Sequence, residues 1–95
     1  MVESNNNPIH PDGGDVTTLD QILPPGTCQV VMVTSTGSFR RRLLALGFIP
    51  GTLIEAIRVA PLGDPVEYKI KGYFISLRKE DARFISVVRK EDHHD

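Results

Sequence analysis

The chain of 95 residues contains one cysteine, no tryptophan and no long hydrophobic run. Cys28 has no partner for an internal disulfide, and a single thiol cannot build a thiolate metal cluster. No apolar segment approaches the ~20 residues that a transmembrane helix needs, and the polar N-terminus lacks the apolar core of a signal peptide. These absences favour a small protein of a reducing compartment, and we expect it in the cytoplasm.

The motifs of catalysis are also missing. No G-x-x-x-x-G-K-[ST] loop is present, so we expect no binding or hydrolysis of GTP by this chain. His10, His93 and His94 lie in segments predicted to be tails, where no packed neighbours would hold their rings in place. Glu80 and Asp81 are adjacent on a predicted surface turn, which suits capping or solubility. We therefore predict that the protein is not an enzyme and has no cofactor.

The net charge of −1 conceals an uneven distribution. All 11 lysines and arginines lie between Arg40 and Lys90. Residues 1–15 are rich in Asn, Pro, Gly and Asp and have little to bury, so we predict a disordered tail there, and residues 91–95 form a charged C-terminal tail. The folded domain is predicted over residues 16–90. Its excess of positive charge suits an acidic protein face, an anionic membrane or nucleic acid, or it serves solubility alone.

The first part of the predicted domain combines a helical turn with a strand. Thr18 and Gln21 have the spacing of a capping box, in which the threonine hydroxyl accepts a hydrogen bond from the Gln21 backbone N–H. Pro24 and Pro25 limit this helix to about one turn. A β-branched run of strand length follows over residues 28–34.

A two-turn helix is predicted over residues 39–46. Ser38 is placed to cap its N-terminus, and Gly47 is the left-handed residue that ends such a helix. The apolar residues at positions 39, 43 and 46 form one stripe for the core. Arg40 and Arg41 therefore face solvent.

The second half alternates between strands and turns. We predict strands over residues 52–60, 66–71, 74–78 and 84–88, with a short helical turn over 79–83. The alternation of the first strand slips between Ala56 and Ile57, which indicates a bulge. Pro50-Gly51 fits a type II turn, and Gly72-Tyr73 fits a type II′ hairpin turn. Five short strands with one helix after the first predict an all-β fold, a small closed barrel.

Two blocks of the sequence resemble the FeoA family, the accessory proteins of bacterial ferrous-iron uptake. The family's central motif is similar to residues 41–52 (RRLLALGFIPGT), and its second block is similar to residues 72–82 (GYFISLRKEDA). Its usual opening resembles TLDQ at 18–21 with the Pro25-Gly26 pair. The resemblance covers residues 17–88 in the family's order and spacing.

This resemblance implies a fold, a location and a partner. The family fold is an SH3-like barrel with a helix inserted after the first strand, which agrees with the pattern above. The implied partner is FeoB, the membrane Fe²⁺ transporter with a cytosolic GTP-binding domain, on which the small protein would dock in the cytosol to modulate uptake. We expect a monomer or a weak dimer, because an open edge strand of such a barrel permits association.

The candidate contact residues are Arg40, Arg41, Leu44, Tyr73 and Phe74. The two arginines suit bidentate pairing with carboxylates or phosphates, and Leu44 would add an apolar anchor beside them. The alternative is an ordinary solvated helix face. The two aromatic residues lie at the tip of the predicted hairpin, where they either anchor a partner or, for at least one of them, fold back onto the core.

Two further possibilities remain open. His93, His94 and Asp95 form at most a weak, adventitious site for a first-row divalent ion, or simply a frayed terminus; transition-metal binding is otherwise a property of the family that the resemblance implies. The alternative function is a small basic β-barrel that binds nucleic acid. Such binding needs basic residues interleaved with exposed aromatic residues on one sheet face, a pattern that is approached but not completed by Lys69, Lys71, Tyr73 and Arg78.

Overall fold

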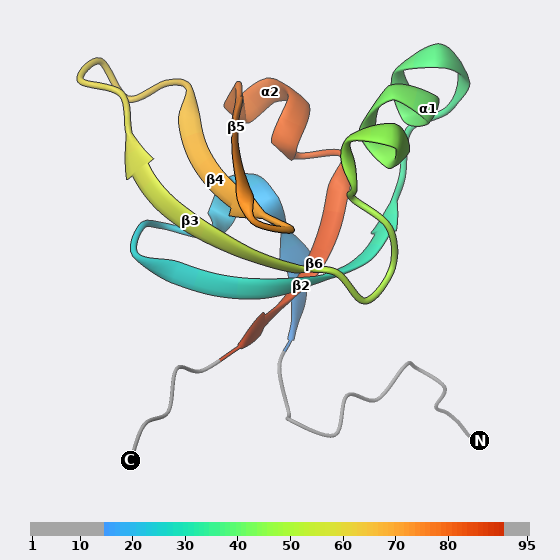
Figure 1. Ribbon diagram of the computed structural model, residues 1–95, viewed down its shortest axis with the longest axis horizontal. Coiled ribbons are helices and arrows are strands. Elements are labelled where there is room, and N and C mark those ends of the chain that lie inside the picture. The colour runs from blue at the N-terminus through green and yellow to red at the C-terminus, as the bar shows by residue number, and fades with distance from the viewer. Residues whose placement is uncertain (1–14, 91–95) are drawn as a thin grey trace.

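The computed structural model describes residues 15–90, which form one six-stranded antiparallel sheet that curls around its core (Figure 1). The strand order is β1-β6-β2-β3-β4-β5. The strands are β1 (Val16–Thr18), β2 (Gly26–Val33), β3 (Leu53–Val59), β4 (Val66–Ile70), β5 (Tyr73–Leu77) and β6 (Ile85–Lys90).

Three short helices lie in the connections. They are the 3₁₀ turn η2 (Leu19–Gln21), the helix α1 (Gly37–Leu46) between β2 and β3, and the helix α2 (Lys79–Ala82) before β6. None of these helices is long and apolar enough to cross a membrane. The longest of the three, α1, lies between β2 and β3, which is the connection that the sequence predicted for it.

The core is filled from every strand except β1. Its largest fully buried side chains include Tyr68 of β4, Leu43 of α1 and Phe48 after α1. The alternation predicted for β4 is confirmed, because Val66, Tyr68 and Ile70 are buried while Glu67 and Lys69 are not. Within residues 15–90, no charged side chain is buried.

The predicted bulge in the third strand is confirmed. The register between β3 and β4 shifts between Ala56 and Arg58, so that one residue of β3 has no opposite partner. Ile54 and Ala56 are fully buried before the shift, and Val59 packs against the core after it. The bulge bends β3 and lets one strand serve both ends of the curled sheet.

The prediction of a capping box at Thr18 and Gln21 was wrong. Thr18 ends a strand, because it pairs with Ser86 in the β1–β6 ladder. Its hydroxyl donates to Asp20 Oδ1 at 2.5 Å and caps no backbone N–H, and the Gln21 amide donates to the other oxygen of Asp20 at 3.1 Å. A capping box needs both side chains to accept from backbone N–H groups, whereas here both donate to the Asp20 carboxylate, a strong acceptor. The six-stranded sheet therefore contains one strand more than the five predicted. Within residues 15–90 its edge strands β1 and β5 do not pair, so the barrel is open there and not closed as predicted.

Two turn predictions were confirmed and two details were wrong. Gly47 ends α1 with φ at 115°, and Gly51 has the positive φ of a type II turn. However, α1 begins at Gly37 with Thr36 as its N-cap residue, not Ser38. The hairpin turn consists of Lys71 and Gly72, both with positive φ, which is the signature of type I′ rather than type II′.

The predicted tails lie almost wholly outside the described part of the chain, and the domain boundaries at residues 16 and 90 remain predictions. His10, His93, His94 and Asp95 are also outside residues 15–90.

Candidate partner-binding surface

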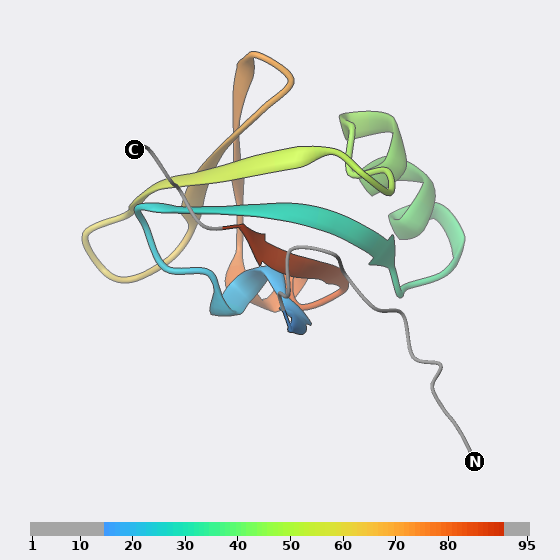
Figure 2. The same ribbon diagram turned by 90° about the horizontal axis from the view of Figure 1, so that it is seen from below.

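Helix α1 lies at one end of the sheet, opposite the loop between β3 and β4 (Figures 1 and 2). Its apolar stripe faces the core, with Leu43 fully buried and Phe39 and Leu46 partly buried. Arg40 and Arg41 are exposed, as the helical period requires. The helix thus presents a basic face to solvent while a single apolar stripe holds it on the domain.

The positive charge of α1 is not neutralised within the described domain. Over residues 15–90 the arginines of α1 form no ion pair, in contrast to Arg58, whose Nη1 lies 2.8 Å from Glu67 Oε1. Helix α1 contains no acidic residue of its own. An unpaired cluster of this kind attracts acidic surfaces and steers their approach.

Aromatic contacts fix α1 against the start of β6. The rings of Phe39 and Phe84 meet edge to face, with 5.7 Å between centroids and an interplanar angle of 83°. The Arg42 guanidinium lies 5.7 Å from the Phe39 ring, and that of Arg83 lies 4.7 Å from the Phe84 ring. Sequence reasoning missed this cluster, because its two halves lie far apart in the chain and carry no shared motif. It restricts the exposed guanidinium groups of Arg42 and Arg83.

The two predicted aromatic residues face different surroundings. The Tyr73 hydroxyl donates a hydrogen bond to the Leu46 carbonyl at the end of α1, although 42% of the residue remains exposed. Phe74 is 56% exposed, and Lys69 Nζ lies 6.0 Å from its ring centroid. Neighbouring residues of a strand point to opposite faces, so Tyr73 reaches α1 while Phe74 stays on the outer face of the sheet.

Leu44 is half-buried and packs against the core. It lies between the exposed arginines and the end of α1 where Tyr73 binds. The structure therefore brings four of the five predicted contact residues to α1 and its C-terminal end, and leaves Phe74 apart. The contact role of all five remains a prediction.

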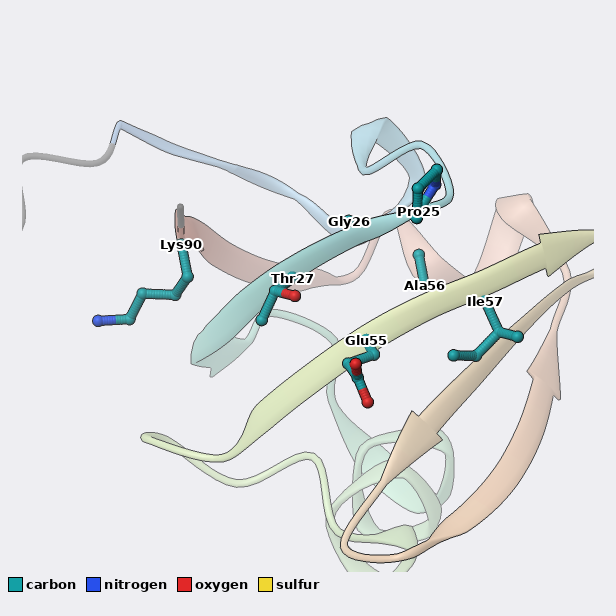
Figure 3. A pocket seen from close by; sticks show the side chains of 7 residues that line it. All are labelled: Pro25, Gly26, Thr27, Glu55, Ala56, Ile57 and Lys90. Atoms are coloured by element: carbon teal, nitrogen blue, oxygen red, sulfur yellow. The ribbon is translucent and has the colours of Figure 1, made fainter. Parts of the chain in front are cut away.

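The outer face of the sheet carries two shallow hollows of about 350 Å³ each. Figure 3 shows the first, which is lined by Pro25, Gly26, Thr27, Glu55, Ala56, Ile57 and Lys90. The second shares Thr27 and Glu55 with it and continues to Lys69 and Lys71. These hollows collect mixed charge on a solvated surface, with Thr27 and Glu55 paired across β2 and β3 at their shared border.

The groups with shifted pKa values lie in the core rather than at a cleft. Burial raises the pKa of the Cys28 thiol to about 12, although the charge of Arg89 opposes the shift. Burial also raises the pKa of Tyr68, with smaller contributions from Cys28, Asp20 and Asp64. Both groups are neutral packing residues at physiological pH.

Within residues 15–90, no three side chains of His, Cys, Asp or Glu converge on a possible metal position. The candidate metal ligands His93, His94 and Asp95 lie outside these residues, so that site stays a prediction.

Comparisons with known proteins point to one family. The model of the FeoA domain matches residues 17–89. The chain is 48% identical over 58 residues to the Fe(2+) transport protein A/Fe(2+) transporter FeoB fusion protein of Porphyromonas gingivalis. That match covers 61% of this chain but only 7% of the fusion protein.

Solved structures agree with the sequence matches. A FeoA-like protein from Clostridium acetobutylicum is 30% identical with a TM-score of 0.75, over 84% of this chain and 93% of that one. The zinc complex of Stenotrophomonas maltophilia FeoA, described as a prokaryotic SH3 domain protein, is 28% identical with a TM-score of 0.64, over 75% and 88%. The SH3-like fold expected from the sequence is confirmed.

Proposed function

The chain belongs to the FeoA family, and we propose that it is a cytosolic accessory protein of bacterial ferrous-iron uptake that docks on the transporter FeoB. The family is linked to ferrous iron transport. The observation that carries the proposal is the Porphyromonas fusion protein, in which a domain similar to this chain is joined covalently to FeoB. Two domains that occur within one polypeptide are held close to each other, which favours a contact between their free-standing counterparts.

The exposed face of α1 is the surface that we propose for docking. Arg40 and Arg41 carry charge that no described residue neutralises, and the aromatic contacts beneath them hold the helix in place. Arginine pairs well with carboxylates in bidentate geometry. We therefore expect an acidic patch on the cytosolic part of FeoB as the complementary surface.

We propose that this contact acts by regulation and not by catalysis. The hollows of the outer face are shallow and solvated, and the shifted thiol and phenol are packed in the core. A small domain with one basic face suits the role of a docking module, which changes the behaviour of a larger partner.

Calorimetric titration tests the proposal. The protein is titrated with the purified cytosolic domain of FeoB from the same organism, with and without guanine nucleotide. We expect saturable binding, and we expect the double variant Arg40→Glu/Arg41→Glu to weaken it at least about tenfold, the range for charges at a complementary interface. The thermal midpoint should hardly change, since exposed charges contribute little to stability.

The matched control is Arg78→Glu/Lys79→Glu, which changes the net charge equally at two adjacent exposed positions outside α1. Equal weakening by both variants would show that overall charge, rather than α1, governs binding. Unchanged binding of the α1 variant would refute the proposed surface. Absence of binding by the unmodified protein in both nucleotide states would refute docking on that domain.

A further inference from the structure

One edge of the sheet is unpaired at β5. The strand order ends there, and among the strands of residues 15–90 only β4 pairs with β5. The far edge of β5 therefore faces no other strand of the described domain. Such an edge carries backbone donors and acceptors that can extend the sheet.

The register identifies these backbone groups. Tyr73 pairs with Ile70 across the two-residue turn, and the pair that closes a type I′ turn exchanges both hydrogen bonds. Because bonded and non-bonded pairs alternate in an antiparallel ladder, Ile75 and Leu77 also bond to β4. The N–H and C=O groups of Phe74 and Ser76 must then point away from β4.

These outward groups have no partner within residues 15–90. No backbone or side-chain hydrogen bond of the described domain uses the main chain of Phe74 or Ser76 outside the β4 ladder. Both residues are exposed. The N–H and C=O groups of Phe74 and of Ser76, with Ile75 between them, therefore remain available to an added strand.

The edge also lacks the usual protection against pairing. Natural edge strands carry lysine, proline or a bulge that discourages addition, whereas Tyr73–Leu77 (YFISL) is regular and uncharged. Lys71 precedes the strand, and Arg78 and Lys79 follow it. Asp64 also lies at this second end, where its Oδ1 accepts a hydrogen bond from the Lys79 backbone N–H, and Glu80 and Asp81 come next in α2. None of the three basic residues forms an ion pair within the described domain.

We propose that β5 accepts, as a seventh strand, an extended segment of a partner protein with acidic residues at both ends of an uncharged centre. The acidic ends would face the side chain of Lys71 at one end of β5 and those of Arg78 and Lys79 at the other, while the centre bonds to Phe74 and Ser76. This inference does not depend on docking on FeoB, because it concerns a different surface from the arginines of α1.

A second copy of the chain fits this edge less well. If two β5 strands paired antiparallel about Ile75, the turn that carries Lys71 in each copy would come near Arg78 and Lys79 of the other. Like charges brought together in this way repel each other. An acidic segment replaces both repulsions with attractions.

The exposed ring of Phe74 strengthens the expectation. It stands on the outer face, with Lys69 Nζ at 6.0 Å, and an added strand would place a side chain beside it. Aromatic and β-branched neighbours across a ladder stabilise each other. The central residues of the segment are therefore expected to be β-branched.

Amide hydrogen exchange on the full chain tests the proposal directly. The probe is a nine-residue peptide with alternating valine and threonine in its centre and two acidic residues at each end. In the free protein, the amides of Phe74 and Ser76 should exchange faster than those of Ile75 and Leu77. The acidic peptide should slow both at least about tenfold, since each gains a backbone hydrogen bond. The same peptide with lysine at its ends should bind more weakly.

Substitution of Ser76 supplies the matched variant. Ser76→Pro removes one outward N–H but no ladder bond, a position that proline tolerates in edge strands, whereas Ser76→Ala retains the N–H. The proline variant should lose peptide binding and the alanine variant should keep it. If Ser76→Pro fails to fold, the exchange measurement on the unmodified protein still decides.

Three results would overturn the proposal. Peptide binding that protects amides elsewhere would place the site on another surface. Protection of Phe74 and Ser76 in the free protein that rises with protein concentration would show that a second copy occupies the edge. No protection by the acidic peptide at millimolar concentration would show that the edge is closed to added strands.

Discussion

Replacing Gly47 with alanine should destabilise the domain by about 1–2 kcal/mol, the cost of a left-handed conformation in a residue with a Cβ atom. Gly47 ends α1 with φ at 115°, and its N–H lies against the carbonyl groups of Leu43 and Leu44. An added Cβ would lie 3.4 Å from Ile70 Cδ1 and 3.5 Å from the Tyr73 hydroxyl. These are ordinary contact distances, so the loss should come from backbone strain and not from collision.

Gly51→Ala separates the two causes. Gly51 also has a positive φ, at 93°, but no atom of the described part of the chain lies within 4 Å of the position that its Cβ would take. If backbone strain alone causes the loss of stability, the losses of Gly47→Ala and Gly51→Ala should agree within about 0.5 kcal/mol. Such agreement would show that the space between α1 and the β4–β5 turn can hold the added methyl group at position 47.

Urea unfolding followed by circular dichroism measures both losses. The midpoint should fall with an unchanged slope, and the thermal midpoint should drop by about 4–8 °C for each kcal/mol in a domain of this size. A loss below about 0.3 kcal/mol would refute the enforced left-handed conformation. If Gly47→Ala loses several kcal/mol more than Gly51→Ala, the added Cβ must collide with its neighbours, and the assignment of the loss to backbone strain alone would be refuted.

Two predictions concern the core. The folded state holds the proton of Cys28 up to a pKa of about 12, against 9.0 ordinarily, whereas the unfolded state releases it above pH 9. The free energy of unfolding should therefore not depend on this thiol below pH 9. Above pH 9 it should fall by up to ~1.4 kcal/mol per pH unit. Urea titrations at pH 8 and 10.5 should show a smaller fall for Cys28→Ala than for the unmodified protein; equal falls would contradict the burial argument. The Tyr68 hydroxyl is buried and has no hydrogen-bond partner within residues 15–90, so Tyr68→Phe should change stability by no more than about 0.5 kcal/mol. A thermal unfolding loss above about 1.5 kcal/mol would instead indicate a hydrogen bond to a buried water.

The elements between residues 28 and 88 could be predicted because local chemistry determines them. Alternation placed Tyr68 inside, and glycine chemistry placed the end of α1 and the turn at Gly51. The strand β1 could not be predicted in this way. Its three residues carry almost no periodic signal, and they are ordered by pairing with β6, a segment distant in the chain.

The candidate surface was likewise predictable where local periodicity determines it, and not where it depends on tertiary contacts. The helical period is enough to expose Arg40 and Arg41, since one apolar stripe must face the core. The contact between Phe39 and Phe84 is tertiary, and no spacing in the sequence indicates it. The open edge of β5 likewise depends on the strand order, which the alternation of single strands does not reveal.

The pairing of β1 with β6 has a consequence for how the domain is attached to other proteins. Val16 lies opposite Val88, so the chain enters and leaves the described domain at neighbouring points, on the side away from α1 (Figure 1). A linker at either terminus would therefore start from the same place and leave the arginine face free. When such a domain is tethered to its target, the local concentration reaches the millimolar range for short flexible linkers. A weak contact then suffices in a fusion, whereas a free-standing chain must reach the same occupancy through its own affinity or abundance.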